Sequence, residues 1–339
     1  MSGSKTRRKR ALRFLLFVSP IIIFLISLDV GTYHLSPKDL TKTLISGVVP
    51  SAYPGIPQVL KDIVFRIRLP RILLALMVGA ALSISGASLQ ALFKNPLVNE
   101  FTLGISFGAA FGAALSLIFL GKTFPTQLAA FLFAIVAVLA VLLIAGRSDI
   151  PIVSLLLTGV IISAFFSALL SLVEFFASPY SLQALFSWLM GNLSLAAWKD
   201  LAISIPLMAV GTIVLILLRW RMNVLSLSDE EAKSLGVDVK REKFLVVVAA
   251  TLATAAATSV AGIIGWVGLI VPHLVRMIVG VDNRVVIPLS AAFGASFLLL
   301  ADDVTRVIAP FEIPIGVFTS IIGIPLFVVL FKRSKGTWL

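Results

Sequence analysis

The side chains that could carry out chemistry in this chain do not combine into a catalytic or metal-binding set. There is no cysteine, and the two histidines, His34 and His273, are far apart in the sequence, which excludes thiolate sites and histidine clusters. No P-loop Gly-x-x-x-x-Gly-Lys-Ser/Thr, His-Glu-x-x-His helix or credible Ser-His-Asp combination occurs. We therefore expect a protein that is not an enzyme and binds no metal or cofactor of its own. His273, which follows a proline, is expected to be structural.

Charged side chains are concentrated in one interior stretch, residues 226–243, which reads SLSDEEAKSLGVDVKREK. Long apolar segments flank this stretch on both sides. It must therefore lie outside the lipid, because charges and unpaired backbone groups are costly in a bilayer.

A short helix is predicted over 229–235 within this stretch. Asp229 can cap its N-terminus, and the two glutamates that follow suit its first turn, since acidic side chains are stabilised there. Gly236 is suited to end the helix. Ala232 and Leu235 are three positions apart and share one face of this helix. The residues of interest are Asp229, Glu230, Glu231, Ala232, Leu235 and Gly236.

Other polar side chains mark the ends of apolar segments. Arg68 and Arg71 stand in the run RLPR at a predicted outer mouth, with Pro70 in the first turn of a helix. Gln90 lies near the inner end of the same segment, and Asn95 begins an Asn-Pro pair that should turn the chain.

Three acidic residues fall at predicted outer ends of apolar segments. These are Glu174 and the pair Asp302 and Asp303. At such positions we expect solvated caps rather than members of a proton relay.

The elements that must position these groups are membrane helices. Of the 339 residues, 59% are hydrophobic and only 13% are charged, whereas a soluble chain has about 25%. Runs of about 20 apolar residues recur from end to end. We predict an all-α polytopic membrane protein in which residues 1–339 form one domain. Its ten predicted spans are 14–30, 70–93, 101–120, 126–146, 152–173, 199–219, 243–263, 265–280, 286–301 and 314–331.

The distribution of basic residues predicts the orientation. Residues 1–13 form a basic segment before the first span, which we expect to remain uncleaved because no Ala-x-Ala-like site follows it. With the N-terminus inside, 19 of the 28 lysines and arginines fall in cytoplasmic segments, and ten spans return the C-terminus to the cytoplasm. The net charge of +12 is thus an orientation signal and not a sign of nucleic-acid binding.

Two outer segments should lack full spans. Residues 31–68 contain four prolines and are predicted to be irregular with short helical pieces. Residues 182–190 form a short apolar stretch that is expected to dip into the outer surface or lie on it.

Residues 68–104, RLPRILLALMVGAALSISGASLQALFKNPLVNEFTLG, closely resemble the signature of the iron-siderophore, haem and cobalamin uptake permeases, the vitamin B12-type ATP-binding cassette (ABC) importers. Residues 262–306 and 313–327 match the same family, and the charged stretch falls where that family has its coupling loop. Residues 230–236 are similar to the Glu-Ala-Ala-x-x-x-Gly motif of such loops, with Glu231 in place of an alanine.

The resemblance implies a type II ABC importer permease fold with about ten transmembrane helices. It implies uptake of a metal chelate, a ferric siderophore first and haem or cobalamin next, from a periplasmic or extracellular binding protein. The implied partners are a second copy or a paralogous permease, two ABC ATPase subunits that hold ATP and Mg, the binding protein and membrane lipid. The implied location is the plasma (inner) membrane of a bacterium or archaeon.

The resemblance also implies roles for individual residues. In such permeases arginines meet glutamates on the binding protein, and the matching positions are Arg68, Arg71 and Arg306. The ATPase would contact the predicted helix at 229–236. The inner gate would lie near Ile152 and Val153, whose branched apolar side chains suit a dewetted constriction. Gln90 and Asn95 are the further gate or pathway candidates.

The main alternative is a secondary transporter driven by an ion gradient. Such a transporter needs charged or polar groups at mid-membrane to couple the ion. The middles of the predicted spans are nearly free of carboxylates, and this favours the importer.

Overall fold

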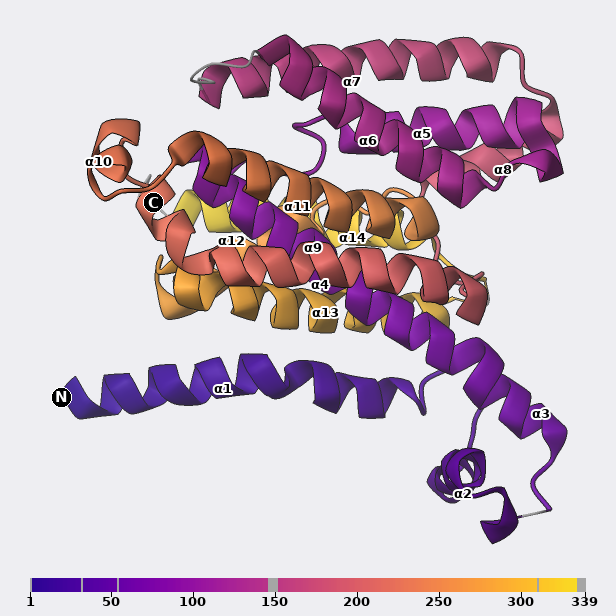
Figure 1. Cartoon of the computed structure of the whole chain (residues 1–339). Helices are drawn as coiled ribbons and strands as arrows, with labels where there is room; N and C mark the ends of the chain where they lie inside the picture. The colour runs from indigo at the N-terminus through magenta and orange to yellow at the C-terminus, as the bar shows by residue number, and fades with distance from the viewer. Residues whose placement is uncertain (1, 32, 54, 146–151, 310, 334–339) are drawn as a thin grey trace.

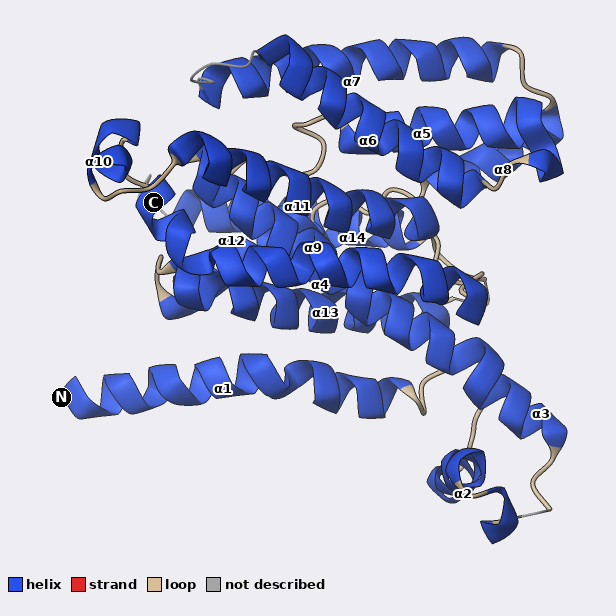
Figure 2. Ribbon diagram, in the orientation of Figure 1, coloured by secondary structure: helices blue, strands red, loops and turns tan. Residues whose placement is uncertain are grey.

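The computed structural model describes residues 2–31, 33–53, 55–145, 152–309 and 311–333, and every regular element in these ranges is helical (Figure 2). Each of the ten predicted spans corresponds to a helix. These are α1 (Ser2–Ser27), α4 (Leu69–Phe93), α5 (Ile105–Leu115), α6 (Thr126–Ala145), α7 (Ile152–Phe175), α9 (Trp198–Leu225), α11 (Val239–Ala261), α12 (Val267–Val279), α13 (Asn283–Val307) and α14 (Ile315–Arg333). Within the described ranges seven helical segments are long and apolar enough to cross a membrane, whereas α5, α12 and α14 are shorter.

Helix α4 is the centre of the bundle, and most of its residues are buried. It packs against α9, α11, α12 and α13, while α1 lies along α13 and α5, α6 and α7 form a further layer beside α11 (Figure 1). The start of α1, the end of α14 and the short helix α10 (Asp229–Ser234) lie at one end of the bundle. The helices α2 (Pro37–Val48) and α8 (Pro179–Leu189) lie at the other end. This arrangement puts the termini and the charged stretch on one side, as the charge distribution predicts.

Close backbone contacts hold α4 to its neighbours. A Cβ atom on Gly86 would lie 1.9 Å from the carbonyl oxygen of Gly268 in α12, and one on Gly79 would lie 2.3 Å from the carbonyl oxygen of Gly294 in α13. Small residues allow the two backbones to approach closely. In lipid the hydrophobic effect does not drive helices together, and van der Waals contact at such close distances stabilises the packing instead.

Gly86→Ala should therefore be strongly destabilising. The new methyl group would collide with backbone, which has little freedom to move, so α4 and α12 must separate at an expected cost of about 1–3 kcal/mol. We expect a lower thermal midpoint and less folded protein in membranes, measured by fluorescence-detected gel filtration. Gly55→Ala is the matched control, since a Cβ there meets no atom within 4 Å. Equal midpoints for the two variants would contradict the packing argument.

The first long helical run begins earlier than predicted. A short helix α3 (Gln58–Lys61), a π-helical segment η2 (Asp62–Arg68) and α4 form one continuous run of 36 residues. Pro70 stands in the first turn of α4, as predicted, but the helical run does not begin there, because the π-helical segment leads directly into α4. In the π-helical segment the N–H of Leu69 bonds to the carbonyl of Val64, and this wider turn accommodates a proline that lacks an N–H.

The two outer segments follow their predictions. Helix α2 and a 3₁₀ turn, η1 (Pro50–Ala52), are the short helical pieces of the first outer segment. Helix α8 forms the short apolar helix of the second, and Ser178 caps it by accepting a hydrogen bond from the N–H of Ser181.

Candidate coupling loop and outer arginine cluster

Helix α10 forms within the charged stretch, and its N-terminal cap lies one residue before the predicted one. The Ser228 hydroxyl oxygen accepts from the N–H of Glu231 at 3.2 Å, and the Glu231 carboxylate accepts from the N–H of Ser228 at 2.9 Å. This capping box satisfies two N-terminal donors, so Asp229 is the first helical residue and not the cap. These hydrogen bonds hold the pKa of Glu231 below its usual range.

The C-terminus of α10 is fixed by Gly236, as predicted. The N–H of Val237 bonds to the carbonyl of Ala232 at 3.2 Å, and the N–H of Gly236 bonds to that of Lys233 at 2.9 Å. This is the Schellman pattern, which needs a left-handed residue after the helix. Gly236 has φ +79°, a region that glycine enters without steric cost.

Ala232 and Leu235, which were expected to share one face of α10, differ in exposure. Leu235 is 63% exposed, whereas Ala232 is 1% exposed and packs into the core between α9 and α11. The side chain of Ala232 is covered by this chain, so a contact of Ala232 with a partner, which stays a prediction, would have to involve its backbone. Glu230 and Leu235 remain available on the surface.

Ionic contacts tie the loop to the membrane helices on either side. Lys94, which follows α4 in the left-handed conformation, donates its Nζ to the carbonyl of Leu227 just before α10. Lys243 of α11 forms an ion pair with Asp229, with Nζ and Oδ2 2.7 Å apart. The segment that contains α10 is thus bonded directly to the end of α4 and to α11.

At the opposite end of the bundle a buried cluster surrounds Asp302. Its carboxylate accepts from Arg71 of α4, with Nη2 and Oδ1 2.9 Å apart, and pairs with Arg306 one turn along α13, with Nε and Oδ2 3.2 Å apart. Arg71 also reaches Glu312 after α13, at 2.7 Å. The expectation that Asp302 is a solvated cap is wrong, since it is 0% exposed and binds two guanidinium groups.

Asp303 and Arg68 extend this cluster to the end of α1. Asp303 is buried too, which overturns its predicted role as a solvated cap, and it pairs with Arg306 and accepts from the Ser27 hydroxyl. Arg68 donates to the carbonyls of Leu28 and Tyr33. The pairs of Arg306 with Asp302 and Asp303 lie within α13, but the contacts of Arg71 and Ser27 join residues more than 200 positions apart, and Arg68 binds carbonyls of irregular backbone, so the sequence pattern could not show these.

The three arginines predicted to dock a binding protein are thus buried. Arg68, Arg71 and Arg306 are between 4% and 7% exposed, and each has partners within the chain. In the cluster the most accessible carboxylate is that of Glu312, whose side chain is 50% exposed. Docking through these arginines stays a prediction, and it would require an incoming carboxylate to replace Glu312.

The gate candidates lie at the start of α7. Ile152 is its first residue, and its side chain falls outside the described residues. Val153 is 65% exposed and continues into an apolar exposed face with Leu157 and Val160. No side chain of this described face carries a charge.

The other pathway candidates have local roles. Gln90 is fully buried and joins α4 to α12, donating to the carbonyl of Gly268 at 3.2 Å and accepting from Arg276. Asn95 is half-buried, and its side-chain oxygen accepts from the N–H of Leu97 at 2.9 Å, which forms the predicted turn. His273 is buried in α12, in agreement with a structural role.

One carboxylate lies at mid-membrane depth although it belongs to none of the predicted spans. Glu100 immediately precedes the predicted span 101–120, and its side chain is buried beside Leu82 in the middle of α4. The chain between α4 and α5 folds back into the membrane before α5 begins at Ile105, and this was not evident from hydropathy.

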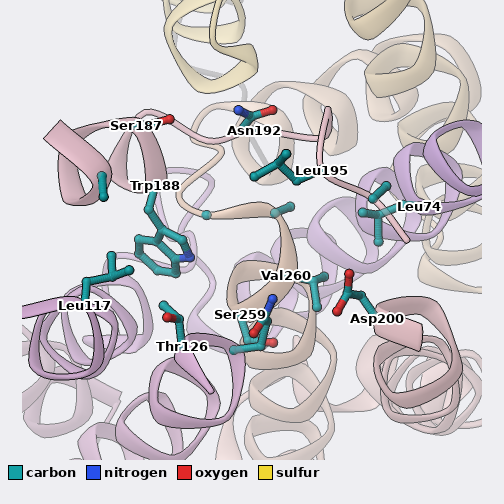
Figure 3. Close-up of a pocket in the computed structure, with 15 residues that line it drawn as sticks. Leu74, Leu117, Thr126, Ser187, Trp188, Asn192, Leu195, Asp200, Ser259 and Val260 are labelled. Atoms are coloured by element: carbon teal, nitrogen blue, oxygen red, sulfur yellow. The ribbon is translucent and has the colours of Figure 1, made fainter. Parts of the chain in front are cut away.

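A cavity of about 310 Å³ lies next to α8, at the end of the bundle opposite α10, and no sequence pattern indicates it. Figure 3 shows the Trp188 ring and the Asp200 carboxylate reaching into it from opposite sides. Thr126, Asn192 and Ser259 add polar groups to its wall. Both helices and connecting segments of this chain line the cavity.

Comparison with known proteins gives a consistent result. The FecCD transport family matches residues 19–333. A protein of Helicobacter pylori named "Probable iron chelatin transport system permease protein" is 44% identical over 277 residues, which cover 82% of this chain and 84% of the relative. A cobalamin import system permease protein of Halobacterium salinarum is 43% identical over 288 residues, which cover 83% and 76% of the two chains.

A solved structure of a metal-chelate type ABC transporter in an inward-facing conformation is similar to the whole chain. Its TM-score is 0.85 at 36% identity, and the match covers 96% of this chain and 99% of the other. The similarity therefore includes the α10 region and the outer arginine cluster as well as the membrane helices.

Proposed function

The chain belongs to the FecCD transport family, and from that premise we propose that this permease takes up a metal chelate, a ferric siderophore first and haem or cobalamin next. The observation that carries the proposal is the match of one family over residues 19–333, which includes α10 and both ends of the bundle. A permease for iron chelatin and one for cobalamin are almost equally similar in sequence. These relatives therefore do not rank the cargoes. The order proposed here follows the resemblance of residues 68–104 to the signature of the siderophore, haem and cobalamin permeases.

The cytoplasmic partner in this proposal is a pair of ABC ATPase subunits that grip α10. Three features support the contact: both ends of α10 are capped, Leu235 projects from it, and Lys94 and Lys243 bind its flanks. A helix that is capped at both ends and bonded to its neighbours would move with the ATPase as a rigid body, whereas a flexible loop would change its conformation instead. ATP hydrolysis by the partner would then drive rigid-body gating between inward- and outward-facing states.

The outer partner in this proposal is a substrate-loaded binding protein. The cluster holds three arginines whose charges are balanced by Asp302, Asp303 and Glu312, so docking through it would exchange one of these carboxylates for a carboxylate of the binding protein, and complementary charge of this kind guides docking. Because Asp302 and Asp303 are buried beneath the arginines, the half-exposed Glu312 is the group that an incoming glutamate would displace from Arg71.

The proposed assembly is a homodimer with one pathway along its two-fold axis, since closed two-fold symmetry is the commonest arrangement. The apolar face of α7 that contains Val153 and Leu157 supports this, because it is exposed in the single chain. Helix α14 presents a similar face with Ile321 and Ile324. Lipid would cover the remaining apolar surface.

Transport in liposomes tests the energy source. Liposomes that contain this chain, its ATPase partner and the binding protein are expected to take up labelled ferric siderophore only with ATP. Uptake should persist when the proton and sodium gradients are collapsed by ionophores. Uptake that needs no ATPase but stops with either gradient would establish the secondary transporter instead. Parallel assays with haem and cobalamin rank the cargoes.

A further inference from the structure

A carboxyl group without a partner lies inside the membrane part of the protein. Glu100 is 3% exposed, and neither of its side-chain oxygens hydrogen-bonds to another described residue. It belongs to the turn 94–104, which joins α4 to α5. Buried carboxylates elsewhere in the chain, such as Asp302, have guanidinium partners, so the isolation of Glu100 is distinctive.

The depth of this carboxyl group follows from its neighbours. Its Oε2 atom lies 2.8 Å from the point where a Cβ atom of Gly268 would stand, and the carbonyl oxygen of Leu82 lies 2.9 Å from the same point. Leu82 is 11 residues before Phe93, the last residue of α4, which places it about 16 Å from the inner end of the helix. The group is therefore near the centre of a hydrocarbon layer about 30 Å thick.

Non-helical backbone lies beside Glu100, and helices interrupted in this way are common at binding sites within membranes. Helix α11 ends at Ala261, residues 262–266 are not helical, and α12 begins at Val267, so the first turn of α12 faces the carboxyl group. Non-helical backbone at membrane depth is tolerated where protein covers it, and interrupted helices commonly hold ions or substrates. On the other side, the Ser163 hydroxyl of α7 donates to the carbonyl of Phe101 at 3.0 Å.

The arginine, lysine and glutamate side chains of the surrounding helices bind other groups or lie at helix ends. Arg276 of α12 donates to the side-chain oxygen of Gln90 and to the carbonyl of Ala87. The charged or titratable groups of α4, α5, α7 and α12 are Arg71, Glu174, His273 and Arg276. Arg71 and Glu174 lie at the outer ends of their helices, and Lys94 lies just beyond the inner end of α4.

An ionised carboxylate in this setting would be very costly, because no hydrogen bond from another described residue offsets its loss of water. A metal ion would need several oxygen ligands, and the described residues contain no cluster of acidic or histidine side chains that could hold one. A single proton removes the charge without further ligands.

We propose that Glu100 is a proton-binding site at mid-membrane. It holds a proton while α7 and α12 pack against the turn 94–104. When these helices separate and water reaches the group, the O–H bond breaks, its electron pair stays on the carboxylate, and the proton passes to water. The inference does not rest on the proposed cargo or energy source, and the measurements below do not depend on them.

Labelling with dicyclohexylcarbodiimide tests the proton directly. This apolar reagent enters bilayers and modifies carboxyl groups in their protonated form. We expect mass spectrometry of the full chain in native membrane vesicles to find the adduct on Glu100 and to find none on Asp302, which is equally buried but paired with two arginines. Glu100→Gln should abolish the adduct. Modification of Asp302 with Glu100 untouched would overturn the proposal.

Thermal unfolding supplies a second, independent measurement. A carboxyl group that keeps its proton in the folded state and releases it on unfolding loses stability as the pH rises above its unfolded pKa of about 4.3. The midpoint of the wild type is expected to fall by about 2 °C or more on going from acidic to alkaline pH relative to Glu100→Gln, which cannot titrate. Parallel pH profiles for the two proteins would mean that Glu100 binds no proton in the folded state.

Discussion

Asp302→Ala is expected to prevent stable folding of the protein. The substitution removes the carboxylate that both Arg71 and Arg306 bind, and it leaves two guanidinium groups, each less than a tenth exposed, without that counter-charge. Loss of one partner from a buried ion pair costs about 3–5 kcal/mol, which is a large part of the stability of a typical domain. The measurements are the yield of folded protein after extraction into mild detergent and its thermal midpoint.

The control for this experiment is a carboxylate in an exposed ion pair on the same side of the membrane. Asp62 pairs with Arg66 at 3.2 Å, and both side chains are well exposed. Because such pairs contribute about 0–1 kcal/mol, Asp62→Ala should fold with a nearly unchanged midpoint. If both variants behave alike, the buried cluster is not a major source of stability.

The second large effect is expected at Leu235. This side chain is 63% exposed on α10 and makes no essential contact within the chain, so Leu235→Glu should leave insertion and folding unchanged. If Leu235 is an anchor in the groove of the ATPase, introducing a charge there should cost at least about 2 kcal/mol, or roughly a 30-fold loss of affinity. The measurements are co-purification of the ATPase and ATP-driven uptake.

A matched substitution separates loss of contact from a general effect of the new charge. Leu195 is 84% exposed at the opposite end of the bundle, before α9. Leu195→Glu adds the same charge and should keep full association with the ATPase. Normal association and uptake in Leu235→Glu would show that α10 is not the contact.

The number and order of the membrane helices were predictable from hydropathy. A segment that crosses lipid must satisfy its backbone hydrogen bonds internally, so each crossing appears in the sequence as a long apolar helix. The end of α10 was predictable too, since Gly236 leaves little choice of conformation. The capping residue was misplaced by one position because Ser228 and Asp229 are both good caps. Only the reciprocal hydrogen bonds between Ser228 and Glu231 distinguish them.

The state of the ionisable groups was not predictable from local sequence. Asp302 and Asp303 stand near a helix end, where solvation is the ordinary outcome, and their environment depends on Arg71 of α4 and on Ser27 at the end of α1. Glu100 follows an Asn-Pro turn that marks an inner loop, yet the loop re-enters the bundle. In both cases a contact distant in sequence decides the charge environment.

The continuous helical run from Gln58 to Phe93 has a consequence for how the two sides of the membrane communicate. Arg71 fastens the run to the outer cluster, and Lys94, directly after it, fastens it to the backbone that leads into α10. A single helical run therefore reaches from the arginine cluster at one end of the bundle to the segment before α10 at the other. If the proposed partners bind at these two ends, thermodynamic linkage requires that each partner changes the affinity for the other by the same factor.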